Sequence, residues 1–220
     1  MKILIVAATG KEIAPLIKII SAKNIKEGSI KSGFINSQKI DILLTGVGMV
    51  ATAFHCAKKI SGHYDFVINM GVAGSFKKNI PMGSVVNVVA DRFSELGAEN
   101  GEEFLTLKEM NLWGVDEIKE NLPFKNKKIA ALKKVRGITV NTVHGNKSSI
   151  KKIIKKFNPD IETMEGCAFL YACKNEGVPC VQIRAVSNMV EPRNKENWDI
   201  PLAIKNLNKT CIEIVHSMTG

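Results

Sequence analysis

The sequence is poor in aromatic residues and has no cysteine pattern typical of a disulfide-stabilised fold. Phe, Trp and Tyr make up 6% of its 220 residues, and its five cysteines contain no CxxC pair. An odd number of dispersed cysteines is typical of buried free thiols in a reducing compartment, and it gives no support for a disulfide framework or a metal site. We therefore expect a cytoplasmic protein without a bound metal.

Long hydrophobic runs and a nucleic-acid signature are also missing. The apolar segment MKILIVAATG is followed by Lys11 and Glu12, and no later stretch approaches the roughly 18 apolar residues of a membrane helix. The formal net charge is +10, but the lysines are scattered and no aromatic residues interleave with them as stacking platforms would. The sequence therefore predicts no membrane or nucleic-acid partner, and a basic surface that helps to attract a small anionic substrate.

What the sequence does contain is an alternation of apolar strands and amphipathic helices. The predicted strands are Lys2–Ala8, Ile30–Phe34, Lys39–Leu44, Phe66–Met70, Ser84–Ala90, Gly137–Asn141, Ile161–Thr163 and Val178–Val186. The predicted helices begin at Gly10, Val50, Lys147, Met164 and Trp198. Such alternation is typical of a largely parallel sheet with helices on both faces. No repeat or linker is visible, so residues 1–220 are expected to form one domain.

Two segments carry their own expectations. Asp91–Pro123 is acidic and irregular, and we interpret it as an insertion or lid that contains a short helix. In the helix predicted over Lys147–Phe157, the spacing of Ile150, Ile153 and Ile154 indicates that these side chains face the core.

Ligands of such sheets bind beyond the carboxyl ends of the strands, so residues that follow strands are the candidates for chemistry. Two predicted glycine turns, Gly46–Gly48 and Gly71–Gly74, lie at such places. Neither matches the glycine-rich motifs for dinucleotides or nucleoside triphosphates, so no cofactor is expected. Each is either a plain tight turn or a place where the backbone approaches a ligand closely.

Five polar side chains lie near strand ends, and each has an ordinary explanation beside a functional one. Glu12 and Glu165 are early in predicted helices, where the helix dipole favours a carboxylate, but Glu12 is also a candidate general base for water and Glu165 a candidate acceptor for adjacent hydroxyls such as those of ribose. Arg184 leaves an apolar strand and needs a partner, which an ion pair or a ligand would supply. Asn188 and His144 either cap local structure or contact a ligand.

The order and spacing of these segments resemble the purine nucleoside phosphorylase and nucleosidase superfamily over nearly the whole chain. The segments that carry the resemblance are INMGVAGSF, DRFSELGAENGEEFL, IETMEGCAF and IRAVSNMVEPRNKENWDIPLAIKNLN. Within the superfamily, the chain is most similar to the futalosine hydrolases of an alternative menaquinone pathway. The resemblance implies a three-layer α/β fold, with a central mixed, mostly parallel sheet flanked by helices. It also implies a homo-oligomer, dimeric or higher, and a purine nucleoside as substrate.

The resemblance assigns roles to individual positions. In related nucleosidases a glutamate at the position of Glu12 activates the attacking water, and an arginine at the position of Arg184 helps to place it. Glu165 matches the glutamate that holds the ribose hydroxyls, with Met164 beneath the sugar. The remaining substrate-binding positions are Gly74, Val143, His144 and Ser187.

Two positions depart from the adenosine-type nucleosidases. Asn188 stands where those enzymes have an aspartate, and its amide can donate to the 6-oxo group or N7 of hypoxanthine, the base of futalosine. Val72 stands where they have a serine, which leaves open how the water is held. The Ala8–Glu12 segment stands where the phosphorylases have a phosphate-binding turn, and its acidic group Glu12 would repel phosphate, which favours hydrolysis.

We therefore expect hydrolysis of the N-glycosidic bond of futalosine. The alternatives are a methylthioadenosine/S-adenosylhomocysteine nucleosidase, a purine nucleoside phosphorylase, or a nucleoside-binding module without catalysis. Candidates for holding the aryl-carboxylate end of futalosine are Asp91–Phe104, with Arg92, Phe93 and Phe104, and Glu191–Trp198, with Arg193.

Overall fold

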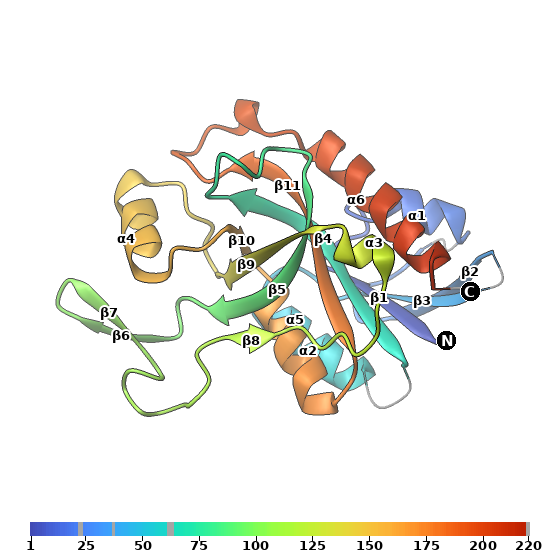
Figure 1. Cartoon of the computed structure of the whole chain (residues 1–220), viewed down its shortest axis with the longest axis horizontal. Helices are drawn as coiled ribbons and strands as arrows, with labels where there is room; N and C mark the ends of the chain where they lie inside the picture. Colours follow the sequence, from blue (N-terminus) through green and yellow to red (C-terminus); the bar gives the residue numbers. More distant parts are fainter. Residues whose placement is uncertain (22–23, 37, 61–63, 219–220) are drawn as a thin grey trace.

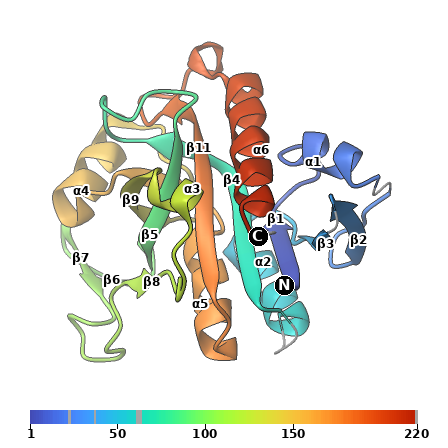
Figure 2. The same cartoon turned by 45° about the vertical axis from the view of Figure 1, so that its right-hand side comes forward.

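The computed structural model describes residues 1–21, 24–36, 38–60 and 64–218. Its centre is a mixed nine-stranded sheet with helices on both faces, beside a separate two-stranded hairpin (Figures 1 and 2). The strands are β1 (Ile3–Ala7), β2 (Ile30–Ile35), β3 (Gln38–Leu44), β4 (Phe66–Ser75), β5 (Val85–Phe93), β6 (Gly97–Asn100), β7 (Glu103–Thr106), β8 (Ile118–Lys119), β9 (Lys133–Thr139), β10 (Ile161–Thr163) and β11 (Cys180–Met189). The helices are α1 (Ala14–Ile19), α2 (Met49–Lys59), α3 (Lys127–Ala130), α4 (Lys147–Phe157), α5 (Gly166–Glu176) and α6 (Ile200–His216). The predicted α/β class is confirmed.

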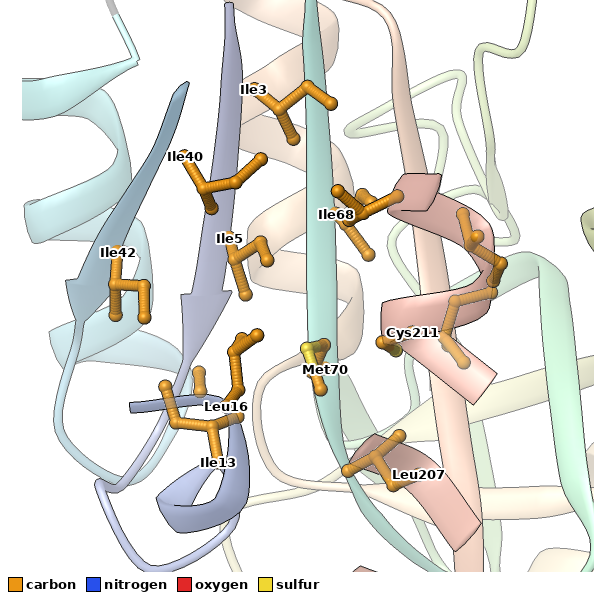
Figure 3. Packing of buried hydrophobic residues seen from close by; sticks show 14 of the residues in the cluster. Ile3, Ile5, Ile13, Leu16, Ile40, Ile42, Ile68, Met70, Leu207 and Cys211 are labelled. Carbon is orange, nitrogen blue, oxygen red and sulfur yellow. The ribbon is translucent and has the colours of Figure 1, made fainter. Parts of the chain in front are cut away.

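Strand β1 shows why the structure has three layers. Its five residues are all buried, and successive side chains alternate between the two faces of the sheet. Ile3 and Ile5 belong to the core under α1 and α6, which Figure 3 shows together with Leu207 from α6. Leu4 and Val6 belong to the core under α2 and α5. A continuous apolar strand is therefore required here, because helices cover both of its faces.

Five strands of the sheet close into a ring. The sheet order is β10-β9-β5-β11-β4-β1-β3-β2, and β10 also pairs antiparallel with β4. This second pairing matches Ile161 with Ser75 and Glu162 with Gly74. The ring encloses a small core of its own, made of Ala73, Ile80, Val86, Val88, Val135, Ile161 and Val186. Closure brings the ends of β4, β10 and β11 together.

The turn predicted at Gly71–Gly74 is wrong, because β4 continues through it to Ser75. These residues pair with β11, where Arg184 lies opposite Gly71 and Asn188 opposite Gly74. The glycines serve close packing instead of turning the chain. A Cβ at Gly71 would lie 3.2 Å from Arg184 Nη1 and 3.2 Å from Glu12 Oε1. The glycine turn at Gly46–Gly48 does precede a helix, with positive φ at both glycines.

Other expectations also change. Asp91 lies within β5, and the residues that follow this strand form β6, β7 and β8. The short helix expected in Asp91–Pro123 is therefore wrong. Glu12 lies in the turn before α1 and not in the helix. Helix α4 has the predicted bounds, but Ile154 is 39% exposed and does not face the core. The five cysteines are buried and free, as predicted.

Candidate active site

A cavity of about 330 Å³ lies at the carboxyl ends of β1, β4, β10 and β11. Its lining consists of Ala8, Thr9, Lys11, Glu12, Val47, Val72, Ala73, Gly74, Val143, His144, Glu162, Thr163, Met164, Glu165, Ser187, Asn188, Met189, Glu191, Arg193, Trp198, Ile200 and Ile204. Every catalytic and substrate-binding position assigned by the resemblance is in this lining except Arg184, which is buried beside it. The position follows the general rule for sheets with parallel strands.

At one end, the cavity is built around Glu12; we call Thr9, Glu12, Val72 and Arg184 the Glu12 end. Glu12 Oε2 accepts hydrogen bonds from the Thr9 backbone N–H (3.0 Å) and hydroxyl (3.1 Å). Glu12 Oε1 accepts from the backbone N–H of Val72 at 3.2 Å. Val72 therefore holds Glu12 through its backbone N–H. The side chain of Val72 has no hydroxyl, and the hydroxyl in this region comes from Thr9.

Arg184 supports the Glu12 end from within the protein. It is 1% exposed, and its Nη2 donates to the side-chain oxygen of Asn69. Burial lowers the pKa of Arg184, while the charges of Glu165, Glu12 and Asp91 raise it. A guanidinium keeps its proton in proteins, so Arg184 is a buried positive charge on which the charges of these three carboxyl groups act. Its Nε has no hydrogen-bond partner among the described residues.

Glu165 lies at the start of α5 but does not cap that helix with its side chain. Instead, its Oε1 accepts a hydrogen bond from the backbone N–H of Gly48 at 2.9 Å, which ties α5 to the start of α2. Burial raises the pKa of Glu165, and the Arg184 charge and the Gly48 hydrogen bond oppose this. A carboxylate has about four acceptor sites, so Glu165 can accept further hydrogen bonds, such as those of two neighbouring hydroxyls.

At the opposite side, Gly74, His144, Glu162, Ser187 and Asn188 form a second group, which we call the Asn188 end. The register of β11 shifts between Val186 and Asn188, so Ser187 is the extra residue of a β-bulge. In a regular strand, two successive side chains would point to opposite faces, but here both line the cavity. The Ser187 hydroxyl donates to Asn188 Oδ1 at 2.9 Å.

Glu162 is a member of the Asn188 end that the sequence reasoning missed. Its side chain is 3% exposed, and Oε2 lies 2.6 Å from His144 Nδ1. Oε1 accepts a hydrogen bond from the His144 backbone N–H at 3.1 Å. The register places Gly74 opposite both Glu162 and Asn188. Only the pairing of β10 with β4 reveals this neighbourhood, because the local sequence around Glu162 does not show which strand lies beside it.

A buried network below α5 was also missed. Asp91 is fully buried and accepts hydrogen bonds from the Thr139 hydroxyl at 3.0 Å and Gln182 Nε2 at 3.1 Å. Thr139 in turn accepts from the backbone N–H of Cys167 at 2.7 Å, in the first turn of α5. Burial raises the pKa of Asp91 to about 6, although these hydrogen bonds and the Arg184 charge act against it. The network anchors the helix start that follows Glu165.

The structure separates the two segments suggested for the substrate's distal end. Arg193 and Trp198 line the cavity, with the Arg193 guanidinium carbon 5.1 Å from the centre of the Trp198 ring. Arg92, Phe93 and Phe104 are not part of the lining. Arg92 is instead paired with Asp116 at 2.9 Å and with Glu117. The suggestion for Asp91–Phe104 is therefore wrong for this cavity, because an ion-pair cluster outside it occupies the arginine.

With the geometry described, the chain was compared with known proteins. Residues 2–218 match the profile of the phosphorylase superfamily. The chain belongs to the phosphorylase superfamily. A futalosine hydrolase from Streptomyces coelicolor is 30% identical over 177 residues, covering 76% of this chain and 74% of that protein. Other relatives of this chain are also named as hydrolases or nucleosidases. The predicted N-glycosyl hydrolase class is therefore confirmed.

Solved structures support the superfamily fold. The methylthioadenosine/S-adenosylhomocysteine nucleosidase of Streptococcus pneumoniae, in complex with 8-aminoadenine, superposes with a TM-score of 0.81 at 20% identity, covering 99% of this chain and 100% of that one. The native futalosine hydrolase of Helicobacter pylori gives a TM-score of 0.76 at 17% identity, covering 99% and 97%. Both confirm the three-layer nucleoside phosphorylase-like fold predicted for this superfamily member.

Two further features of residues 1–21, 24–36, 38–60 and 64–218 bear on partners. No helix there is long and apolar enough to cross a bilayer. No cluster of three or more His, Cys, Asp or Glu side chains there is arranged to hold a metal ion.

Proposed function

We propose that this chain hydrolyses the N-glycosidic bond of futalosine, releasing hypoxanthine and dehypoxanthine futalosine for menaquinone biosynthesis. The observation that carries the proposal is the orientation of Asn188. Its Oδ1 accepts from Ser187, and its Nδ2 donates to the Met189 carbonyl at 3.0 Å. One amide N–H and one oxygen lone pair remain, a donor and an acceptor that match the 6-oxygen and the protonated N7 of departing hypoxanthine.

The Glu12 end supplies the nucleophile in this proposal. Glu12 takes a proton from a water molecule that attacks C1′ of the ribose, a general-base contribution worth roughly 10²- to 10⁴-fold. The Thr9 and Val72 hydrogen bonds hold the carboxylate in place. Arg184 lies close to the same carboxylate, since a Cβ added at Gly71 would lie 3.2 Å from both Arg184 Nη1 and Glu12 Oε1, and its positive charge attracts Glu12.

The sugar is proposed to bind between the two ends. Glu165 accepts hydrogen bonds from the ribose hydroxyls, and Met164, which also lines the cavity, packs beneath the ring. Fixing the sugar in this way holds C1′ at a constant distance from the water and the base, which is the proximity component of catalysis. Val143 and His144 complete the wall on the base side.

Hydrolysis is favoured over phosphorolysis by the charges around Glu12. The buried cation Arg184 faces three carboxyl groups, those of Glu12, Glu165 and Asp91. Its charge is therefore already balanced, and a phosphate dianion beside Glu12 and Glu165 would be repelled. A neutral water molecule encounters no such barrier.

The distal part of the substrate is proposed to lie against the loop that follows β11. Trp198, Ile200 and Ile204 provide an apolar wall for an aromatic ring, and Arg193 provides a cation for its carboxylate. Because Arg193 stacks on Trp198, the two groups act as one platform.

We also propose that the chain is a homo-oligomer that associates through α2. Val50 is 79% exposed and Phe54 60% exposed, one helical turn apart on the same face. Val47, which precedes this helix, is 58% exposed and also lines the cavity. A partner that covered this apolar face would border the substrate. Size-exclusion chromatography with light scattering of the wild type and Phe54→Lys tests this proposed association. A monomeric wild type would contradict the proposal.

The proposed substrate is tested with futalosine, inosine and methylthioadenosine, each with and without phosphate. We expect release of hypoxanthine from futalosine that is independent of phosphate and faster than release from inosine. Preference for methylthioadenosine would favour the adenosine-type nucleosidase, the alternative to which the Streptococcus pneumoniae structure points. Dependence on phosphate would identify a phosphorylase. Tight binding of futalosine without turnover would identify a binding module.

A further inference from the structure

The Asn188 end contains a buried contact between Glu162 and His144 whose role is not explained by binding alone. Glu162 is buried, and both hydrogen bonds that it receives within the described residues come from His144. A buried carboxylate is costly unless its charge is paired. The imidazole is the group that pairs it, at 2.6 Å through Nδ1. The geometry fixes the ring, and it fixes which nitrogen is engaged.

The second ring nitrogen of His144, Nε2, is the one that can face a ligand in the cavity. His144 lines the cavity, and its Nδ1 is occupied by Glu162, so Nε2 is the polar atom that the ring offers to a ligand. No hydrogen-bond partner for Nε2 lies among the described residues. The ring packs edge-to-face against Phe76, with centroids 6.3 Å apart, which further restricts its rotation.

The ion pair stands beside the amide proposed to read the base. Gly74 is the register partner of both Glu162 and Asn188. A Cβ added to Gly74 would lie 3.3 Å from Asn188 Nδ2 and 3.4 Å from Glu162 Cγ. The amide and the ion pair therefore flank one short stretch of β4 and can reach the same bound base.

A departing purine needs a proton, and an amide has none to give. Asn188 can donate a hydrogen bond but remains neutral throughout. The titratable or charged groups that line the cavity, besides His144, are Lys11, Glu12, Glu162, Glu165, Glu191 and Arg193. Glu12 and Glu165 are held at Thr9 and Gly48, and Glu191 accepts from Asn197. Arg193 keeps its proton, and Lys11 adjoins Glu12 in the chain, so the Glu162–His144 pair is the one that strand register places at the same β4 residue as Asn188.

We propose that His144, held and charge-balanced by Glu162, is the general acid that protonates the leaving base. This inference rests on the proposed nucleoside hydrolysis. The C1′–N9 bond breaks and its electron pair stays with the base, while the proton on His144 Nε2 moves to a nitrogen of the base. Water adds to C1′ and gives one proton to Glu12. His144 then regains a proton from Glu12 through solvent, so that each turnover consumes one nucleoside and one water.

The test compares one nucleoside with its N7-methylated form in the wild type and in His144→Gln. A 7-methylated base leaves as a neutral molecule and needs no proton. With the ordinary nucleoside, we expect His144→Gln to lower kcat by roughly 10²- to 10⁴-fold, the range for a general acid. With the methylated form, the loss should be less than about 10-fold, since the acid contributes nothing there. Because both rates come from one preparation, their ratio does not depend on the fraction of folded enzyme.

Two further variants sharpen the result. Glu162→Gln keeps a hydrogen-bond acceptor for the His144 backbone but removes the negative charge, and it should show the same selective loss on the ordinary nucleoside. His216→Gln alters an exposed histidine at the end of α6, outside the cavity lining, and should leave both rates unchanged. Equal losses on both nucleosides in His144→Gln, or no loss on either, would overturn the proposal.

The substrate assignment and the general acid fail in different ways. If wild-type enzyme does not cleave futalosine but cleaves another purine nucleoside, that nucleoside and its 7-methyl form replace the pair, and the acid is still tested. If wild-type enzyme cleaves futalosine and His144→Gln shows no selective loss, the substrate assignment stands and the acid is rejected.

Discussion

The Glu12 end and the Asn188 end of the cavity are built in different ways. At the Glu12 end, a buried arginine faces carboxyl groups that come from three distant segments of the chain. At the Asn188 end, a neutral amide and a hydrogen-bonded ion pair lie on neighbouring strands of the closed ring. Charge dominates the first end, and hydrogen-bond direction dominates the second. Substitutions that change charge should therefore be most damaging at the first end, and changes in hydrogen-bond pattern should alter selectivity at the second.

The largest expected effect is that of Glu12→Gln. An amide of the same shape keeps the Thr9 and Val72 contacts to its oxygen partly in place, but it cannot take a proton from water. We expect kcat to fall by roughly 10²- to 10⁴-fold, while hypoxanthine binds with nearly wild-type affinity. Single-turnover kinetics and calorimetry measure the two quantities. Glu213→Gln on the surface of α6 serves as the control, and wild-type kcat in Glu12→Gln would falsify the role of Glu12.

The second prediction concerns the third carboxyl group facing Arg184, that of Asp91. Its pKa is raised to about 6 from an ordinary 3.8, so the folded state binds a proton more tightly than the unfolded state. The stability that this proton provides is complete below about pH 4 and is lost as the pH rises through about 6, by about 3 kcal/mol in total. In Asp91→Asn, this part of the pH dependence disappears.

Urea unfolding of both proteins at several values between pH 4 and pH 8 measures the difference. The wild type should lose stability relative to Asp91→Asn across this range, because the other titrating groups are common to both. Parallel curves would contradict the raised pKa of Asp91. Gln182 Oε1, which lacks a partner in the described structure, is available to accept from the new amide.

The order of most helices and strands could be predicted from the sequence, but the closure of five strands into a ring could not. The helix over Lys147–Phe157 has the predicted bounds, and Gly177 ends α5 in the left-handed conformation that glycine favours. These features depend on local spacing and on the backbone freedom of glycine. The strand through Gly71–Gly74 could not be predicted in this way, since its extended form comes from pairing with β11, over a hundred residues later.

The same distinction holds within the site. Glu12, Glu165 and Asn188 stand near strand ends, and a resemblance to known enzymes was enough to single them out. Glu162 was missed because its importance comes from the β10–β4 pairing that closes the ring. The bulge at Ser187, which turns two successive side chains into the cavity, also arises from strand pairing and leaves no local signal.

The third prediction concerns selectivity at the Asn188 end. Asn188→Asp replaces the amide donor with a carboxyl group, which suits the N7 of adenine and leaves the 6-oxygen of hypoxanthine without its partner. We expect the ratio of kcat/KM for hypoxanthine and adenine nucleosides to shift toward adenine by roughly 10- to 100-fold, the size of one mispaired polar contact. Competition between the two nucleosides in one reaction measures the ratio directly. An unchanged ratio would remove Asn188 from base recognition.

The smallest predicted effect is that of Ser187→Ala, and it distinguishes orientation from contact. The Ser187 hydroxyl donates to Asn188 Oδ1 at 2.9 Å and thereby decides which way the amide points. Without it, the amide is free to rotate, and part of the population presents the wrong atoms to the base. We expect kcat/KM on the hypoxanthine nucleoside to fall about 5- to 10-fold, corresponding to about 1 kcal/mol for one hydrogen bond. Ser187→Thr keeps the hydroxyl and should recover most of the loss; if Thr and Ala behave alike, the amide is oriented by its bond to the Met189 carbonyl instead.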